Sequence, residues 1–136
     1  MESLAETRIR LPTGREAAIV EALRFCYDLS ETDAIILFTL LRGGEYTVDD
    51  LVQKLGLSKA TINRGLSKLV EIGFVQRTRE QRSRVGRPRY KYFVQDPRRV
   101  IERIIHDFEE CAKTFKEELE RLLEAIEKER KTSRES

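Results

Sequence analysis

Apolar and polar residues alternate with two different periods along this chain. Apolar residues spaced three or four apart predict amphipathic helices, whereas strict alternation predicts strands with two different faces. Between residues 74 and 94 the pattern alternates, and a polar loop interrupts it. The helical spacing covers, in order, residues 14–28, 31–42, 48–55, 59–72 and 97–130. This order of elements predicts a mainly α (α+β) fold.

Short polar residues stand where most of these helices should begin, because their side chains can accept bonds from unpaired N–H groups of the first turn. Glycines mark the ends, at Gly43-Gly44, Gly56 and Gly73. Residues 1–12 are expected to be frayed or to form a short arm. The helix over 31–42 is apolar on more than one side and should form the centre of the core. The predicted caps are Thr13 with Glu16, Ser30 with Asp33, Thr47 with Asp50, and Ser58.

The helices over 48–55 and 59–72 are joined by Gly56-Leu57-Ser58, a spacing typical of a helix-turn-helix. In the second helix, Ile62, Leu66 and Leu69 form an apolar face. The opposite face carries cations and hydrogen-bond donors, and the first acidic residue is Glu71. Such a face is suited to binding in the groove of a polyanion. The alternative is an ordinary solvent-exposed face, which usually carries charges of both signs. The candidate DNA-binding residues are Ser58, Lys59, Thr61, Asn63, Arg64, Ser67 and Lys68.

The alternating segment predicts a β-hairpin with strands at 74–79 and 89–94 around a polar loop. A hairpin directly after a helix-turn-helix is the wing of a winged helix-turn-helix domain, here spanning 13–96. Its arginines could contact phosphates or a minor groove, or could serve only to keep the hairpin tip soluble. The candidate wing contacts are Arg82, Arg84, Arg87, Arg89 and Lys91.

The last helix, over 97–130, has an apolar stripe with a spacing close to the 3.5-residue repeat of a coiled coil. A domain of this size cannot cover so long a stripe, so we expect a second copy to cover it and form a homodimer. Packing of this helix on the first helix of its own chain is the alternative, and parallel and antiparallel dimers both remain open. Residues 131–136 are predicted to be a disordered tail. The candidate dimerisation residues are Ile101, Ile104, Phe108, Cys111, Phe115, Leu119, Leu122 and Ile126.

Charge is distributed unevenly over the 136 residues, although the net charge is only +2. Residues 59–91 contain ten Lys or Arg and two acidic residues, which gives this segment +8. The segments 1–58 and 101–136 carry −4 and −3. A basic centre between acidic flanks indicates a local nucleic-acid surface.

Catalytic and metal-binding patterns are missing from the sequence. The single histidine, His106, has no partner set typical of catalysis, and two cysteines without a CxxC motif favour neither a zinc site nor a disulfide framework. We therefore expect no enzyme activity, no cofactor and no metal. With no apolar run of membrane-spanning length and no signal peptide, a cytoplasmic protein without a membrane partner is expected.

Three stretches, 29–41, 46–75 and 86–97, resemble the winged-helix module of the archaeal TrmB-like regulators and, more loosely, MarR. The more specific part is Gly-Arg-Pro-Arg-Tyr-Lys-Tyr-Phe-Val-Gln-Asp-Pro, a wing strand that runs into a helix begun by Asp96-Pro97. The resemblance implies that helix 58–72 enters the major groove of double-stranded DNA. TrmB-like proteins also carry a sugar-binding domain after a coiled coil, which this sequence lacks. The resemblance therefore implies a stand-alone regulator with an unknown effector. The implied contacts are Lys59, Thr61, Asn63, Arg64 and Lys68, with Arg84, Arg87 and Arg89 in the wing.

Three functions fit these patterns. The first is a sequence-specific, dimeric transcription regulator. The second is an architectural DNA-binding protein with little sequence preference, since neutralisation of phosphates would require the same basic surface. The third is a winged-helix adaptor that binds proteins, although it leaves the basic segment unexplained.

Overall fold

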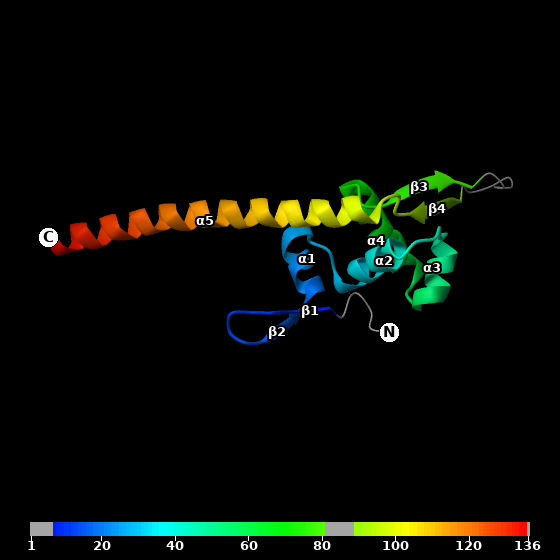
Figure 1. Cartoon of the computed structure of the whole chain (residues 1–136), viewed down its shortest axis with the longest axis horizontal. Coiled ribbons are helices and arrows are strands. Elements are labelled where there is room, and N and C mark those ends of the chain that lie inside the picture. Colours follow the sequence, from blue (N-terminus) through cyan, green and yellow to red (C-terminus); the bar gives the residue numbers. More distant parts are fainter. Residues whose placement is uncertain (1–6, 81–88, 136) are drawn as a thin grey trace. The chain divides into compact units, whose positions relative to one another are not determined.

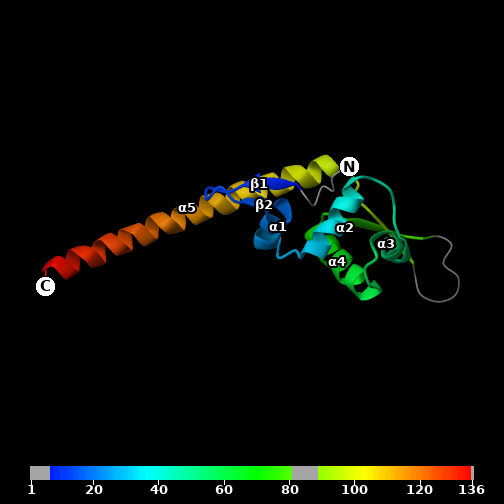
Figure 2. The same ribbon diagram turned by 90° about the horizontal axis from the view of Figure 1, so that it is seen from below.

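A computed structural model describes residues 7–80 and 89–135 of the chain. The chain divides after Val100 into two compact units. The first unit contains helices α1 to α4 and two pairs of strands (Figures 1 and 2), and the second is formed by the part of α5 beyond Val100. The mainly α (α+β) fold is confirmed.

The N-terminal segment differs from the prediction. Strands β1 (Arg8–Arg10) and β2 (Glu16–Ala18) pair antiparallel, and α1 (Ile19–Tyr27) begins only after them. The predicted helix start near Gly14 is wrong because the chain reverses there: Gly14 has a φ of 88°, and its N–H donates to the Leu11 carbonyl at 2.8 Å. Glycine adopts this positive φ without steric cost. The helix ends as predicted, with Asp28 in the left-handed conformation.

Helix α2 (Glu31–Leu41) is the centre of the first unit, as its pattern predicts. The Ser30 hydroxyl accepts a bond from the Asp33 N–H, and the Asp33 carboxylate accepts one from the Ser30 N–H, which together form a capping box. The helix packs against α1 and α4, and Ile36, Leu37 and Leu40 are completely buried. Each such side chain contributes about 1.5–3 kcal/mol through removal of apolar surface from water.

The helix-turn-helix is formed by α3 (Val48–Leu55) and α4 (Lys59–Ile72). The Thr47–Asp50 capping box begins α3, and the Ser58 hydroxyl caps α4 by accepting a bond from the Thr61 N–H. Gly56 and Gly73 end the two helices in the left-handed conformation. Local sequence therefore sets the bounds of both helices as expected. The inner face of α4 is buried at Ile62, Gly65, Leu66 and Leu69.

The hairpin after α4 consists of β3 (Gln76–Arg79) and β4 (Tyr90–Phe93), which pair antiparallel in the register Gln76 to Phe93. Tyr46, before α3, adds an antiparallel bridge to Tyr92 through two backbone hydrogen bonds of 3.0 and 2.7 Å. This bridge fixes the start of the helix-turn-helix to the wing. The predicted wing contacts Arg82, Arg84 and Arg87 lie outside the described residues.

Helix α5 (Pro97–Glu135) continues past the predicted end at residue 130. Residues 131–135 are helical, so the predicted disordered tail is wrong for them. Lys, Arg and Glu favour helix, no Gly or Pro interrupts the segment, and the Thr132 hydroxyl donates to the Lys128 carbonyl at 3.0 Å. Within the second unit, apolar side chains at Phe115 and Leu122 are exposed.

Candidate nucleic-acid interface

The outer face of α4 exposes most of the residues predicted to bind DNA. Lys59, Asn63, Arg64 and Ser67 are exposed, and Thr61 is half-buried. They share one side of the helix because residues three and four apart are neighbours on its surface. The acid-free first turn of α4 leaves this face with donors and cations only.

Two of the predicted contacts also hold the helix end together. The Ser58 hydroxyl lies 2.8 Å from the Thr61 hydroxyl in addition to accepting the Thr61 N–H at 3.1 Å. The Arg64 guanidinium in turn donates to the Thr61 hydroxyl at 3.5 Å. This chain of bonds orients Arg64 along the helix surface, so that its remaining donors are available to a ligand.

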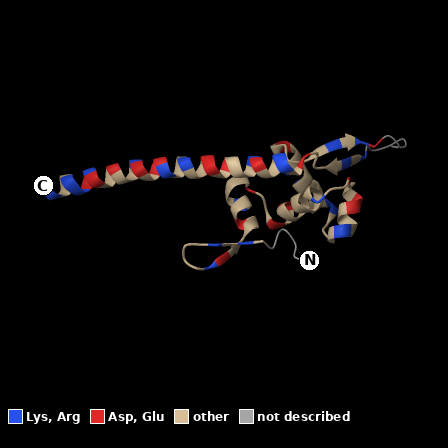
Figure 3. Cartoon of the chain, viewed as in Figure 1, with Lys and Arg blue, Asp and Glu red and all other residues tan. Residues whose placement is uncertain are grey.

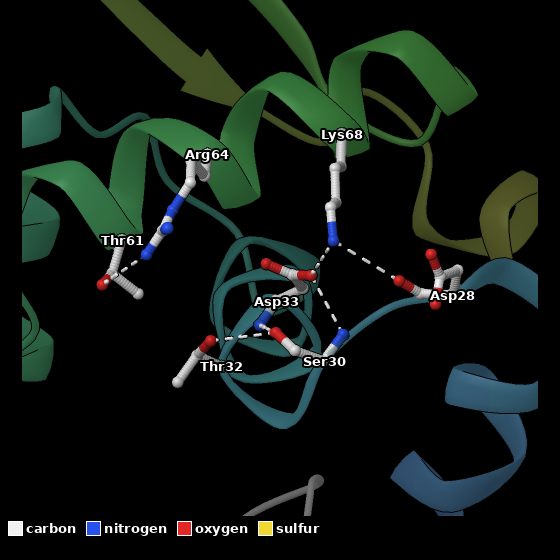
Figure 4. Close-up of polar contacts among 7 residues, drawn as sticks. All are labelled: Asp28, Ser30, Thr32, Asp33, Thr61, Arg64 and Lys68. Carbon is white, nitrogen blue, oxygen red and sulfur yellow. Dashed lines mark hydrogen bonds and ion pairs between the residues drawn. The ribbon is translucent and has the colours of Figure 1, made fainter.

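Lys68 is held differently from the other cations of α4. Its Nζ lies 3.3 Å from Oδ2 of Asp33 and donates to the Asp28 carbonyl at 3.4 Å (Figure 4). The Asp33 side chain is only 5% exposed, whereas that of Lys68 is 48% exposed. Lys68 therefore fastens α4 to the start of α2, a contact across 35 residues that the sequence pattern does not reveal.

Gly65 allows α4 to approach α2 closely. A Cβ atom at this position would lie 2.7 Å from Cδ1 of Ile36 and 2.9 Å from Oδ1 of Asp33, closer than real Cβ contacts. Gly65 is not among the predicted site residues, although a glycine inside a predicted helix is a sequence signal of close packing. Gly65 and Lys68 thus set the position of α4 from its buried side.

A second acidic residue, Asp49, lies among the cations at the other end of the interface. Its Oδ2 atom accepts a bond from the Arg89 guanidinium at 2.9 Å, and its Oδ1 atom lies 3.8 Å from Nζ of Lys59. These residues line an open cavity of about 330 Å³ between α3, α4 and β4, together with Asn63 and Tyr90. Asp49 is not among the residues predicted from the sequence, because the predicted site consists of cations and hydrogen-bond donors.

Asp50, the neighbour of Asp49, is occupied by the cap of α3. The Thr47 N–H donates to its carboxylate at 2.9 Å, and this bond lowers the pKa of Asp50. Burial raises the pKa. It is lowered further by the Thr47 hydroxyl and by the positive charges of Arg89 and Lys91. A hydrogen bond or a nearby cation favours the ionised carboxylate. Asp50 therefore serves the fold, and Asp49 is the carboxylate that faces the cations.

The described cations of the wing lie on its strands or, in the case of Arg89, directly before β4. Figure 3 shows Lys and Arg on both β3 and β4. Arg89 is exposed and Lys91 is half-buried, and the Arg77 guanidinium lies 4.5 Å from the centre of the Tyr90 ring. The strands thus extend the basic surface of α4.

The predicted dimerisation residues all lie on α5. Ile101, Phe115, Leu119, Leu122 and Ile126 are exposed. The other three, Ile104, Phe108 and Cys111, are half-buried. Along the second unit, Lys and Arg alternate with Asp and Glu (Figure 3), as in the Lys116–Glu120 ion pair of 3.8 Å. The helix therefore combines an exposed apolar stripe with a surface of mixed charge.

Other kinds of site find little support in the described part of the chain. Residues 7–80 and 89–135 contain no group of three or more His, Cys, Asp or Glu side chains that could hold a metal ion. Within the same ranges, no helix has both the length and the apolar composition needed to cross a membrane.

The sequence matches a known protein family. Residues 23–98 match the family model described as "Sugar-specific transcriptional regulator TrmB". No curated protein matches the sequence significantly.

Several solved structures have a similar fold. A protein of Methanosarcina mazei Go1 described as a "possible transcriptional regulator" has a TM-score of 0.72 at 20% identity, with 85% of this chain and 96% of that chain covered. A protein of the thermoacidophilic archaeon Sulfolobus tokodaii has a TM-score of 0.60 at 28% identity, with 71% of this chain and 90% of that chain covered. MarR has a TM-score of 0.51 at 22% identity, with 79% of this chain and 85% of that chain covered.

Proposed function

The chain belongs to the TrmB family of transcriptional regulators, and on that premise we propose that it is a homodimeric regulator that reads double-stranded DNA with α4. The observation that carries the proposal is the outer face of α4, which exposes Lys59, Asn63 and Arg64 on a helix capped at both ends. Packing on α2 holds this helix rigidly, as direct reading of base edges requires.

The side chains of α4 differ in what they could read in a major groove. A guanidinium can pair with two acceptors of guanine, and an amide can pair with adenine. We therefore assign base contacts to Arg64 and Asn63, and phosphate contacts to Lys59, Arg89 and Lys91. From their sequence positions, we assign Arg82, Arg84 and Arg87 to the phosphates or the minor groove beside the wing.

The second unit supports a dimer. Phe115 is 63% exposed on α5, and Leu119, Leu122 and Ile126 extend the same stripe. A second copy would remove this apolar surface from water through a two-fold interface. Two α4 helices would then read half-sites about 34 Å apart, or a multiple of that distance. We propose no effector or cofactor.

Selection of bound duplexes from a random pool, followed by footprinting, tests this function. A protected two-fold sequence at low protein concentration is the expected result. Uniform coating of DNA would favour an architectural protein, and absence of binding at low salt would favour a protein-binding adaptor.

The dimer is tested separately by truncation after Asp96, which removes all of α5. Sedimentation should show that the truncated chain is a monomer. Its affinity for DNA should be much lower than that of the full-length chain. A truncated chain that remains dimeric would place the interface outside α5.

A further inference from the structure

An acidic residue among the cations of the proposed DNA-binding surface opposes the approach of phosphates. Asp49 lies at the second position of α3, between the first residue of α4 and the residue before β4. Its two carboxylate oxygens lie 3.8 Å from Lys59 and 2.9 Å from Arg89. One carboxylate thus joins the recognition helix to the wing, and it neutralises one of the two positive charges that it contacts.

These ion pairs are weak enough to exchange partners. The side chains of Asp49, Lys59 and Arg89 are 58%, 64% and 57% exposed, so solvent screens both contacts. A phosphate that approaches Lys59 and Arg89 competes with Asp49 for the same cations, and it is also repelled by the carboxylate. The surface therefore favours a phosphate only where other contacts hold it in position.

We propose that Asp49 is a specificity-determining residue that keeps Lys59 and Arg89 paired until a correctly seated duplex displaces it. This inference rests on the proposed DNA-binding function. Non-specific binding depends almost entirely on phosphate neutralisation, whereas specific binding adds base contacts. Base contacts hold the specific duplex in one register, in which its phosphates can reach Lys59 and Arg89 from the side away from Asp49. A non-specific duplex also samples registers that bring phosphates close to the carboxylate, so Asp49 lowers the affinity for non-specific DNA by a larger factor than the affinity for the specific site.

Asp49 also has a structural role that a control must separate. An acidic residue in the first turn of a helix interacts favourably with the helix dipole. Glu31 is likewise exposed in the first turn of α2, so Glu31→Gln removes the same charge from the first turn of another helix. Thermal melting of both variants measures the structural part alone.

The test compares the full-length wild type, Asp49→Asn and Glu31→Gln by fluorescence anisotropy. The probes are a duplex from the selection and a scrambled duplex of the same length, each titrated over a series of NaCl concentrations. Asp49→Asn should bind the scrambled duplex between about two- and thirtyfold more tightly per protomer, from the usual strength of two exposed ion pairs. The slope of log K against log[salt] should steepen by about 0.9 per protomer. The selected duplex should gain less, and Glu31→Gln should resemble the wild type.

A double-mutant cycle gives a second measurement. Arg89→Gln should weaken binding to the scrambled duplex more in the Asp49→Asn background than in the wild type, because only there is the arginine unpaired before DNA arrives. Equal effects in both backgrounds would refute the inference.

Two other outcomes are distinguishable. If the wild type binds DNA and Asp49→Asn binds the scrambled duplex equally or less tightly, Asp49 orients the cations and does not restrain them, and the inference fails alone. If the wild type binds neither duplex, the proposed function fails and the inference fails with it.

Discussion

The ion pair between Lys68 and Asp33 leads to a prediction that separates positioning from DNA contact. The sequence predicts that Lys68 contacts DNA, yet its Nζ lies 3.3 Å from the buried carboxylate of Asp33 (Figure 4). Lys68→Met removes the charge and keeps most of the aliphatic stem. The change leaves Asp33 with its cap of α2 but without its cation.

The magnitude follows from the exposure of the two partners. Breaking a fully buried ion pair costs about 3–5 kcal/mol, and an exposed pair is worth about 0–1 kcal/mol. Asp33 is buried but Lys68 is 48% exposed, so water can replace part of the lost contact. We expect a loss of about 1–2 kcal/mol in the free energy of unfolding, between these limits. For a unit of about 100 residues this lowers the melting temperature by roughly 4–16 °C.

The assay combines denaturation by urea at a fixed protein concentration with DNA binding over a series of salt concentrations. Lys59→Met is the matched control, because it makes the same substitution at an exposed position on the same helix. Lys68→Met should lower stability and weaken binding while leaving the salt slope nearly unchanged. Lys59→Met should leave stability nearly unchanged and make the slope shallower by about 0.9 per protomer.

The opposite pattern would refute the reasoning. Suppose that Lys68→Met unfolds at the same urea concentration as the wild type, and that its slope of log K against log[salt] becomes shallower by about 0.9 per protomer. Lys68 would then contact phosphate in the complex. A cycle with Asp33→Asn measures the coupling directly, since the two single changes should not be additive if the pair acts as a unit.

Three further predictions concern α3 and α4. Gly65→Ala should lower the free energy of unfolding of the first unit by about 0–2 kcal/mol, because overpacking against Ile36 outweighs the gain in helix propensity. Denaturation by urea measures this loss, and a stabilised variant would contradict the close approach of α2 and α4. The pKa of Asp50 is lower in the folded chain than in the unfolded chain, where it is about 3.9. The ionised carboxylate therefore stabilises the folded state at pH values above the unfolded pKa, and this contribution is lost as the pH falls through the folded pKa. The stability difference between wild type and Asp50→Asn should therefore shrink below about pH 4 in pH-dependent melting, and a constant difference would exclude this ionisation. Arg64→Ala should cost about 1–3 kcal/mol on the selected duplex and relax base preference at one position of each half-site, whereas a uniform loss over all sequences would indicate a phosphate contact.

Local sequence accounts for most of the helix bounds. Ser30 with Asp33, Thr47 with Asp50, and Ser58 begin three helices, as predicted, because a cap involves residues only three apart. A local cap pattern gives the wrong element at residues 8–18. There Thr13 and Glu16 match a capping box, but the turn at Gly14 and the pairing of β1 with β2 replace the helix. Local patterns cannot weigh a helix turn against a hairpin when both are possible.

The sequence by itself determined helix α4: its length, its two capped ends, its apolar face and the donors on the opposite face. Only the tertiary structure decided which of its cations are engaged before any ligand arrives. Lys68 meets Asp33 and Lys59 meets Asp49. The partners lie 35 and 10 residues away and belong to other helices, so no periodicity records the contacts. Charges interact through space, and the packing of α2, α3 and β4 around α4 sets their distances.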